Sequence, residues 1–204
     1  MAANGESAGD VGSAQATEDA LSREACANTA NSNIILIGMP GAGKSTVGVV
    51  LAKILGLDFL DCDLLIQKTC GATLPQLIDS LGPEGFLRVE NDVLSSVSCE
   101  HTVIATGGSA VYSEEAMAHL RAMGRVVYLR VDYDEMARRL GDIHARGVVM
   151  RRGAGMSLRD MFEERLPLYE AWADETIDMD GKTITAAALD VATALADGGE
   201  RKQS

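Results

Sequence analysis

The chain lacks several features that would mark whole classes of protein. No apolar run in its 204 residues approaches the roughly 20 residues that a membrane-spanning helix needs. The four cysteines are scattered without C-x-x-C spacing, which argues against a zinc site or a disulfide framework. Basic residues are scarce too, since 18 Lys and Arg stand against 30 Asp and Glu, and a nucleic-acid-binding surface needs a basic face. We therefore expect a cytoplasmic protein with reduced thiols and with neither membrane nor nucleic acid among its partners.

The first 32 residues differ in composition from the rest of the chain. They hold five acids against one base, Arg23, and few large apolar side chains, so they cannot bury enough surface to become ordered. They have no apolar core of a secretory signal and are too acidic for an organellar transit peptide. We expect a disordered acidic tail over residues 1–32, one folded domain over residues 33–196 and a C-terminal tail over residues 197–204.

A glycine-rich segment follows the apolar run Ile34–Ile37. From Gly38 to Thr46 it reads G-M-P-G-A-G-K-S-T, and a helical pattern starts at once, which is the strand–loop–helix context of a phosphate-binding P-loop. Glycines let backbone N–H groups turn toward a phosphate, and the helix N-terminus adds positive potential. Lys44 can reach the β- and γ-phosphates of a nucleoside triphosphate, and the Ser45 hydroxyl can ligate Mg²⁺. The expected contacts to this cofactor come from Gly41, Ala42, Gly43, Lys44, Ser45 and Thr46.

Strand-like runs alternate with helical patterns along the rest of the chain, which predicts a mainly parallel, doubly wound α/β sheet. The five expected strands are Ile34–Ile37, Asp58–Asp61, Thr102–Thr106, Arg125–Val131 and Glu175–Asp178. The expected helices are Ser45–Leu55, Leu64–Thr69, Leu74–Leu81, Glu84–Val97, Ser113–Ala122, Tyr133–Gly141, Ser157–Ala173 and Ile184–Ala196. In such sheets ligands bind beyond the carboxyl ends of the strands, so functional residues should follow the strands.

Two acids, Asp61 and Asp63, follow the second expected strand. One could help to hold Mg²⁺ through water, and the other could accept a proton or a hydrogen bond from a substrate hydroxyl. The same spacing also fits two acids that simply stabilise a helix N-terminus. The third and fourth strands lack the acid of a usual Walker B strand, so Mg²⁺ would rely on Ser45, phosphates, water and Asp61.

Glycines follow the third expected strand, at Gly107 and Gly108. They permit close approach of the backbone to a ligand, although a plain turn would also use them. Farther along, seven of the 18 basic residues fall between residues 138 and 165, in a stretch that several glycines interrupt. This pattern is typical of a lid that closes over phosphates and supplies charge in the transition state, although some of these arginines can instead pair with neighbouring acids. The seven are Arg138, Arg139, Arg146, Arg151, Arg152, Arg159 and Arg165.

These motifs, in this order, resemble those of the shikimate kinase family, small P-loop kinases related to nucleoside monophosphate kinases. The resemblance spans residues 33–196 and implies a three-layer P-loop kinase fold with an arginine- and glycine-rich lid. It implies magnesium and substrate binding by Asp61 and Asp63, an adenine contact from the Arg138–Arg139 pair, and a lid arginine at Arg146. The family's remaining motifs fall on Phe86-Leu87-Arg88-Val89-Glu90, on Gly107-Gly108-Ser109 and, for the segment that helps to bind the substrate carboxylate, on Arg165-Leu166-Pro167-Leu168-Tyr169.

Three positions depart from the family pattern. The arginine that grips the shikimate carboxylate falls on Leu87, the third glycine of the loop is Ser109, and the proline after the lid arginine is Gly147. A bidentate arginine–carboxylate contact is strong and geometrically specific, so Leu87 bears directly on the substrate. Arg88 is next along the chain but sits about 100° around the helix, so it is no automatic substitute.

The resemblance implies transfer of the γ-phosphate of Mg-ATP to a hydroxyl of shikimate, which gives shikimate 3-phosphate for aromatic amino acid biosynthesis. The expected catalytic residues are Lys44, Asp63 and Arg146, and Arg139 is expected to bind ATP together with the P-loop. The residues expected to contact the acceptor are Asp63, Arg88, Gly107, Gly108 and Arg165. Ser45 and Asp61 are expected to hold the metal. Two alternatives stay open: a kinase of another small hydroxy acid or sugar-like alcohol, and a non-catalytic nucleotide-binding regulatory protein. We expect a monomer.

Overall fold

The structure is a computed structural model that describes residues 33–141, 147–151 and 155–200. The acidic tail expected over residues 1–32, the lid arginine Arg146 and Arg152 lie outside the described residues. Helix α8, Ile184–Glu200, continues through residues 197–200, where the sequence analysis placed the start of a C-terminal tail. Glycines at 198 and 199 disfavour a helix by only about 1 kcal/mol each, which does not prevent α8 from extending over them.

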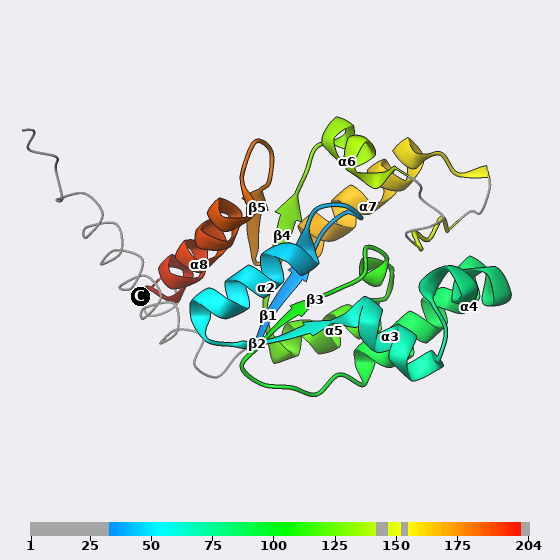
Figure 1. Cartoon of the computed structure of the whole chain (residues 1–204), viewed down its shortest axis with the longest axis horizontal. Coiled ribbons are helices and arrows are strands. Elements are labelled where there is room, and N and C mark those ends of the chain that lie inside the picture. Colours follow the sequence, from blue (N-terminus) through cyan, green and yellow to red (C-terminus); the bar gives the residue numbers. More distant parts are fainter. Residues whose placement is uncertain (1–32, 142–146, 152–154, 201–204) are drawn as a thin grey trace, which may run out of the picture.

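All five expected strands form, and they make one parallel sheet in the order β2-β3-β1-β4-β5 (Figure 1). In β1, Ile35 pairs with Ile104 on one side and with Val126 on the other, and every residue of this central strand is buried. Burial on both faces explains the uninterrupted apolar run in the sequence. The strands are β1 Asn33–Ile37, β2 Asp58–Asp61, β3 Thr102–Ala105, β4 Gly124–Arg130 and β5 Glu175–Asp178.

Helices cover both faces of this sheet. Figure 1 shows α2 and α8 in front of the strands and α5 and α7 behind them, so the α/β P-loop kinase fold that the sequence predicted is confirmed. Besides α8, the helices are α2 Lys44–Leu55, α3 Cys62–Cys70, α4 Leu74–Ser95, the 3₁₀ turn η1 Ala110–Tyr112, α5 Glu114–Met123, α6 Tyr133–Leu140 and α7 Leu158–Trp172.

Helix α4 carries one wall of the site. It begins at a capping box in which Thr73 and Gln76 bond each other's backbone N–H groups, and it kinks at Gly82 (φ +70°) and Pro83, where the sequence predicted a break between two helices. Its inner face packs with α3 in a small second core, which holds Ile66, Leu74, Leu77, Phe86, Val93 and Val149. This core fixes the second half of α4 beside the carboxyl ends of β2 and β3.

Candidate active site

The loop between β1 and α2 has the backbone of a phosphate-binding loop. Gly38, Gly41 and Gly43 all have positive φ, and a Cβ atom on Gly38 would lie 2.6 Å from the carbonyl oxygen of Leu129. Other residues would be strained at these positions, which explains the glycines. Gly43 is the N-cap of α2, and no side chain caps this end, so the first N–H groups of the helix are available to an anion.

Lys44 lies at the first position of α2 and is 8% exposed. Its Nζ donates hydrogen bonds to the carbonyl oxygens of Gly38 (2.8 Å) and Met39 (3.1 Å), so the side chain folds back over the loop. Burial lowers the pKa of Lys44 from 10.5 to about 8, although the carboxylates of Asp63 and two further acids oppose this shift. A buried cation of this kind gains from an anionic ligand, as a triphosphate would be.

A cavity of about 540 Å³ extends from this loop over the carboxyl ends of β1 and β3. Its volume is in the range of small-molecule sites in proteins. Of the residues that the sequence singled out, it brings together Gly41, Gly43, Lys44, Ser45, Thr46, Asp63, Gly107, Gly108, Arg139 and Arg165. Ala42 is fully buried in the core beneath the loop, and neither Asp61 nor Arg88 lines the cavity.

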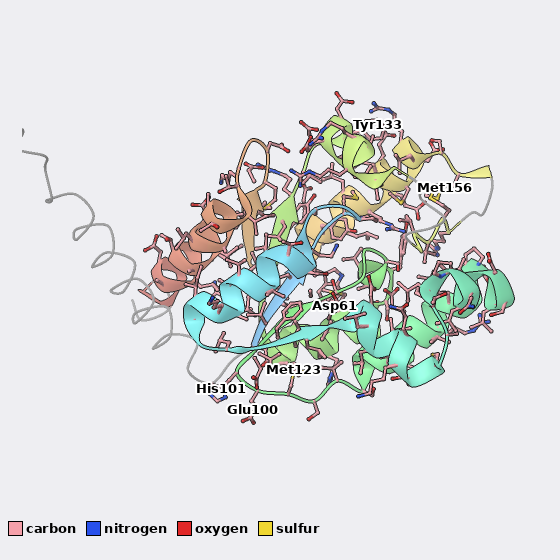
Figure 2. The ribbon with its side chains drawn as sticks, viewed as in Figure 1. Asp61, Glu100, His101, Met123, Tyr133 and Met156 are labelled. Atoms are coloured by element: carbon pink, nitrogen blue, oxygen red, sulfur yellow. The ribbon has the colours of Figure 1, made fainter. Side chains whose placement is uncertain are left out.

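The two acids after β2 take different places. Asp61 caps α3, because its Oδ1 accepts hydrogen bonds from the backbone N–H groups of Asp63 (3.0 Å) and Leu64 (3.2 Å); Figure 2 shows it where β2 meets α3. Asp63 lies in the first turn of α3 and lines the cavity. Burial raises the pKa of Asp63, Lys44 lowers it, and Asp61 raises it again. Asp63 is thus the acid of the pair that can contact a ligand directly.

These residues fit a magnesium ion only together with a nucleotide. Within the described ranges no three His, Cys, Asp or Glu side chains gather into a group that could hold a metal ion. Mg²⁺ is usually held by one or two protein groups, phosphate oxygens and several waters. Ser45 supplies a hydroxyl in the cavity wall beside the P-loop, so the donor set suits a Mg²⁺–triphosphate complex.

Two arginines mark the two ends of the cavity. At the P-loop end, the Nε of Arg139 donates to Glu135 on the same helix (2.6 Å), and a Cβ atom on Gly41 would lie 3.5 Å from the Cβ of Arg139. At the other end, Arg165 is fully buried and donates from Nε to the Tyr112 hydroxyl (3.2 Å) and from Nη2 to the Val149 carbonyl (2.5 Å). The Nη1 of Arg165 lies beside Gly108, at 3.2 Å from the place of a Cβ atom there.

Leu87 and Arg88 line a second cavity, of about 460 Å³, together with Arg151 and Tyr112. The two cavities adjoin, since Glu90 and Ser109 line both. Arg88 is exposed, so the structure does not bring this expected acceptor contact into the cavity that holds the P-loop.

The departure at position 147 has a local cause. Gly147 has φ +64°, and a Cβ atom there would lie 2.6 Å from the Cβ of Leu74. A proline, whose φ is held near −65°, cannot take this conformation. The backbone after position 146 therefore follows a course that requires glycine.

Two acids of this region were not assigned a role from the sequence. Glu135 holds Arg139, and its (i, i+4) spacing from that arginine was a signal that could have been read. Glu90 lies in the cavity wall with 2% of its surface exposed. Glu90 ends the segment that matches a family motif, but a single acid on an amphipathic helix carries no local signal for burial, so packing is what shows its place in the cavity wall.

A parallel sheet with a P-loop after its central strand, and a cavity that joins this loop to a buried arginine, define a P-loop kinase. The shikimate kinase family model matches residues 40–196. A shikimate kinase of Francisella tularensis subsp. holarctica is 36% identical over 167 residues, which is 81% of this chain and 95% of that protein. One of Pseudomonas paraeruginosa is 41% identical over 149 residues, which is 72% and 87% of the two chains. The chain belongs to the shikimate kinase family, and its homologues are phosphotransferases that act on a hydroxyl group.

Solved structures agree with this assignment. The structure of a shikimate kinase from Acinetobacter baumannii in complex with shikimate has a TM-score of 0.77 at 33% identity, over 85% of this chain and 97% of that one. A shikimate kinase structure from Aquifex aeolicus has a TM-score of 0.68 at 28% identity, over 84% and 99% of the two chains. No described helix of this protein is both long and apolar enough to cross a membrane.

Proposed function

We propose that the protein transfers the γ-phosphoryl group of Mg-ATP to a hydroxyl of shikimate and forms shikimate 3-phosphate and ADP. The observation that carries this proposal is a single cavity with a P-loop at one end and with Asp63, Gly108 and Arg165 at the other. The first end suits a triphosphate, and the second offers a hydrogen-bond acceptor for a hydroxyl and a buried cation for a carboxylate.

In the proposed reaction the shikimate hydroxyl oxygen bonds to the γ-phosphorus while the bond from that phosphorus to the β,γ-bridging oxygen breaks. ADP leaves, and Asp63 receives the hydroxyl proton. Lys44 and the N–H groups of the P-loop hold the phosphate oxygens. Ser45 would hold Mg²⁺, with Asp61 acting through water, and the metal would offset phosphate charge. Little covalent chemistry is asked of the protein, because positioning and electrostatic stabilisation supply the rate.

The remaining contacts complete the assignment. Arg139 lies against the nucleotide, Arg165 and the backbone of Gly107 and Gly108 receive the shikimate carboxylate, and Arg146 adds charge to the transferred group. Described residues of one chain supply both ends of the cavity, so the proposed reaction needs no second subunit. We propose a monomeric cytoplasmic enzyme in the pathway to aromatic amino acids. Light scattering on the purified protein tests the monomer.

A coupled assay of ADP release with Mg-ATP and shikimate tests the function. We expect shikimate-dependent turnover with a KM in the ordinary range of roughly 1 μM–1 mM. A second candidate is a kinase for another small hydroxy acid or polyol, and it is favoured by Leu87, which lines the adjoining cavity and brings no cation to the acceptor end. Turnover with another acceptor and none with shikimate would establish that alternative, and ATP binding without turnover on any acceptor would favour a regulatory protein.

The variant Leu87→Arg tests whether the native acceptor carries a carboxylate that a guanidinium at this position can bind. If the native acceptor is shikimate, a guanidinium at this position should lower the KM for shikimate, since a second charged hydrogen bond to a carboxylate becomes possible. Leu87→Lys is the matched control, because it adds the same charge without the planar fork. An unchanged or higher KM for shikimate in both variants would count against shikimate as the native acceptor.

A further inference from the structure

Arg151 is a cation of the second cavity that the proposed reaction leaves without a role. It ends the described segment 147–151, and 58% of its side chain is exposed. The segment is fixed two residues earlier, because Val149 is buried in the small core beside α4 and its carbonyl oxygen accepts a hydrogen bond from Arg165. Arg151 therefore has a defined place, while its guanidinium stays accessible to a ligand.

Tyr112 contacts both Arg151 and Arg165. The guanidinium carbons of these two arginines lie 5.3 Å and 5.0 Å from the centre of the Tyr112 ring, which is within the range of a cation–π contact. The Tyr112 hydroxyl accepts a hydrogen bond from Nε of Arg165 and also hydrogen-bonds Glu164. Oε1 of Glu164 lies 3.8 Å from Nη1 of Arg151. One tyrosine and one acid thus position both guanidiniums.

The two arginines share this cluster with a single acid, Glu164, so it carries an excess of one positive charge. The other charged residues in the wall of the second cavity are Arg88, Asp92 and Glu90. Arg88 and Asp92 are opposite charges at (i, i+4) spacing on α4, so they offset each other. Burial raises the pKa of Glu90 to about 7, so near neutral pH this acid cancels only part of the excess. The cluster therefore favours an anionic ligand.

Arg165 by itself binds only part of a carboxylate. Its Nε and Nη2 donate to Tyr112 and to the Val149 carbonyl, and Nη1 is the nitrogen that lies beside Gly108 in the wall of the first cavity. A carboxylate has two oxygens and is bound most strongly when both accept hydrogen bonds. Because Ser109 lines both cavities, a carboxylate at Gly108 lies where the first cavity meets the second, on the side of Arg151.

We infer that Arg151 is a second acceptor-binding cation, which pairs with the acceptor's carboxylate from the second cavity while Arg165 holds it from the first. Tyr112 and Glu164 are positioning residues for the two guanidiniums. The inference rests on the proposed function and deepens it, because it gives the acceptor's acidic group a second cation although Leu87 brings no charge to this wall. An acceptor of the same shape without a negative charge at this end should bind poorly.

The test combines variants of Arg151 with an acceptor analogue that lacks the charge. Arg151→Gln removes the cation, and Arg151→Lys keeps the charge without the planar fork. The matched control is Arg159→Gln, because the Arg159 side chain is also 58% exposed and also lies on a tyrosine ring, that of Tyr133. For each protein the KM for shikimate and the KM for ATP are measured, together with the inhibition constant of shikimate methyl ester against shikimate.

We expect Arg151→Gln to raise the KM for shikimate at least fivefold, while the KM for ATP and the inhibition constant of the neutral ester both stay within twofold. Arg151→Lys should give a smaller rise, and Arg159→Gln should match the wild type. If Arg151→Gln leaves the KM for shikimate unchanged, or weakens the acid and the ester by the same factor, Arg151 does not bind the carboxylate and the inference is wrong, while the proposed function stands.

A double variant gives an independent measure. Leu87→Arg should lower the KM for shikimate by a larger factor in the Arg151→Gln protein than in the wild type, because a guanidinium at either position serves the same carboxylate. Equal factors in the two backgrounds would contradict the inference, since the two positions would then act independently. A wild-type protein without shikimate-dependent turnover refutes the proposed function and, with it, this inference.

Discussion

Replacing Glu90 by glutamine should stabilise the folded protein, by an amount that grows with pH. Burial is the largest cause of the raised pKa of Glu90, which lies at about 7 in the folded protein against 4.5 for an ordinary glutamate. The unfolded chain therefore gives up this proton more readily than the folded protein does. Above pH 4.5 ionisation favours unfolding, and the effect grows until the pH passes 7, where it levels off.

The size of the effect follows from the two pKa values. The difference between 4.5 and about 7 corresponds to roughly 3 kcal/mol at pH 8, where the group is ionised in both states, and to roughly 1 kcal/mol at pH 5. Glutamine has nearly the same shape and no titrating proton, so it removes this penalty. The free energy of unfolding should rise on substitution by about 2–3 kcal/mol more at pH 8 than at pH 5.

Urea unfolding at pH 5, 6, 7 and 8, followed by circular dichroism, measures this difference. Comparing Glu90→Gln with the wild type at each pH cancels the titration of groups common to both proteins. Asp92→Asn is the control, because it makes the same change from acid to amide at an exposed residue two positions along the same helix. If Glu90→Gln raised the free energy of unfolding by the same amount at pH 5 and at pH 8, burial would not oppose the ionisation of Glu90, and the reasoning would be wrong.

The remaining predictions concern activity. Lys44→Ala should lower kcat in the coupled assay by about 10²–10³-fold or more while the protein stays folded. Lys53→Ala, on the exposed side of the same helix, is the control and should match the wild type. A fully active Lys44→Ala variant would show that the P-loop has no part in the mechanism. Gly107→Ala places a methyl group against the carboxyl oxygens of Glu90 and Asp63. The KM for shikimate should therefore rise about tenfold or more while the KM for ATP stays constant. Equal rises in both KM values would indicate a general distortion of the site instead. Glu135→Gln should raise the KM for ATP by roughly two- to fivefold, because Arg139 loses the carboxylate that orients it. Glu135→Asp keeps a carboxylate and should bring the KM for ATP part of the way back to the wild-type value. A change in the KM for shikimate alone would contradict the orienting role of Glu135.

The sheet and the P-loop could be predicted because their signals are local. A strand buried on both faces must be apolar throughout, as Ile34–Ile37 is, and a loop that turns its N–H groups toward a phosphate must carry glycines at fixed positions. The break at Gly82-Pro83 is local in the same sense, since proline removes a helical hydrogen bond. The alternation of strands and helices predicted a parallel, doubly wound sheet but not the order of its strands. That order, β2-β3-β1-β4-β5, is known only from the pairing of the strands in the structure.

The acceptor end of the site is built from residues that lie far apart in the sequence, so no local pattern shows how they are arranged. Spacing alone leaves either role open to Asp61 and Asp63. The start of α3 makes Asp61 a helix cap and places Asp63 in the wall of the cavity. Arg88 is predicted as an acceptor contact, and the structure places it in the wall of the adjoining cavity, which no pattern in the sequence indicated.

Sequence by itself determined the chemistry at the nucleotide end, because a P-loop places its lysine, its hydroxyl and its N–H groups within nine consecutive residues, Gly38–Thr46. Tertiary structure decided how the acceptor end is assembled, because α3, α4 and α7 bring Asp63, Glu90 and Arg165 to one cavity. The sequence indicated Asp63 and Arg165 there only through motifs shared with a family. The raised pKa of Glu90 is also a property that only tertiary structure decides, because burial among residues that are distant in the chain causes it.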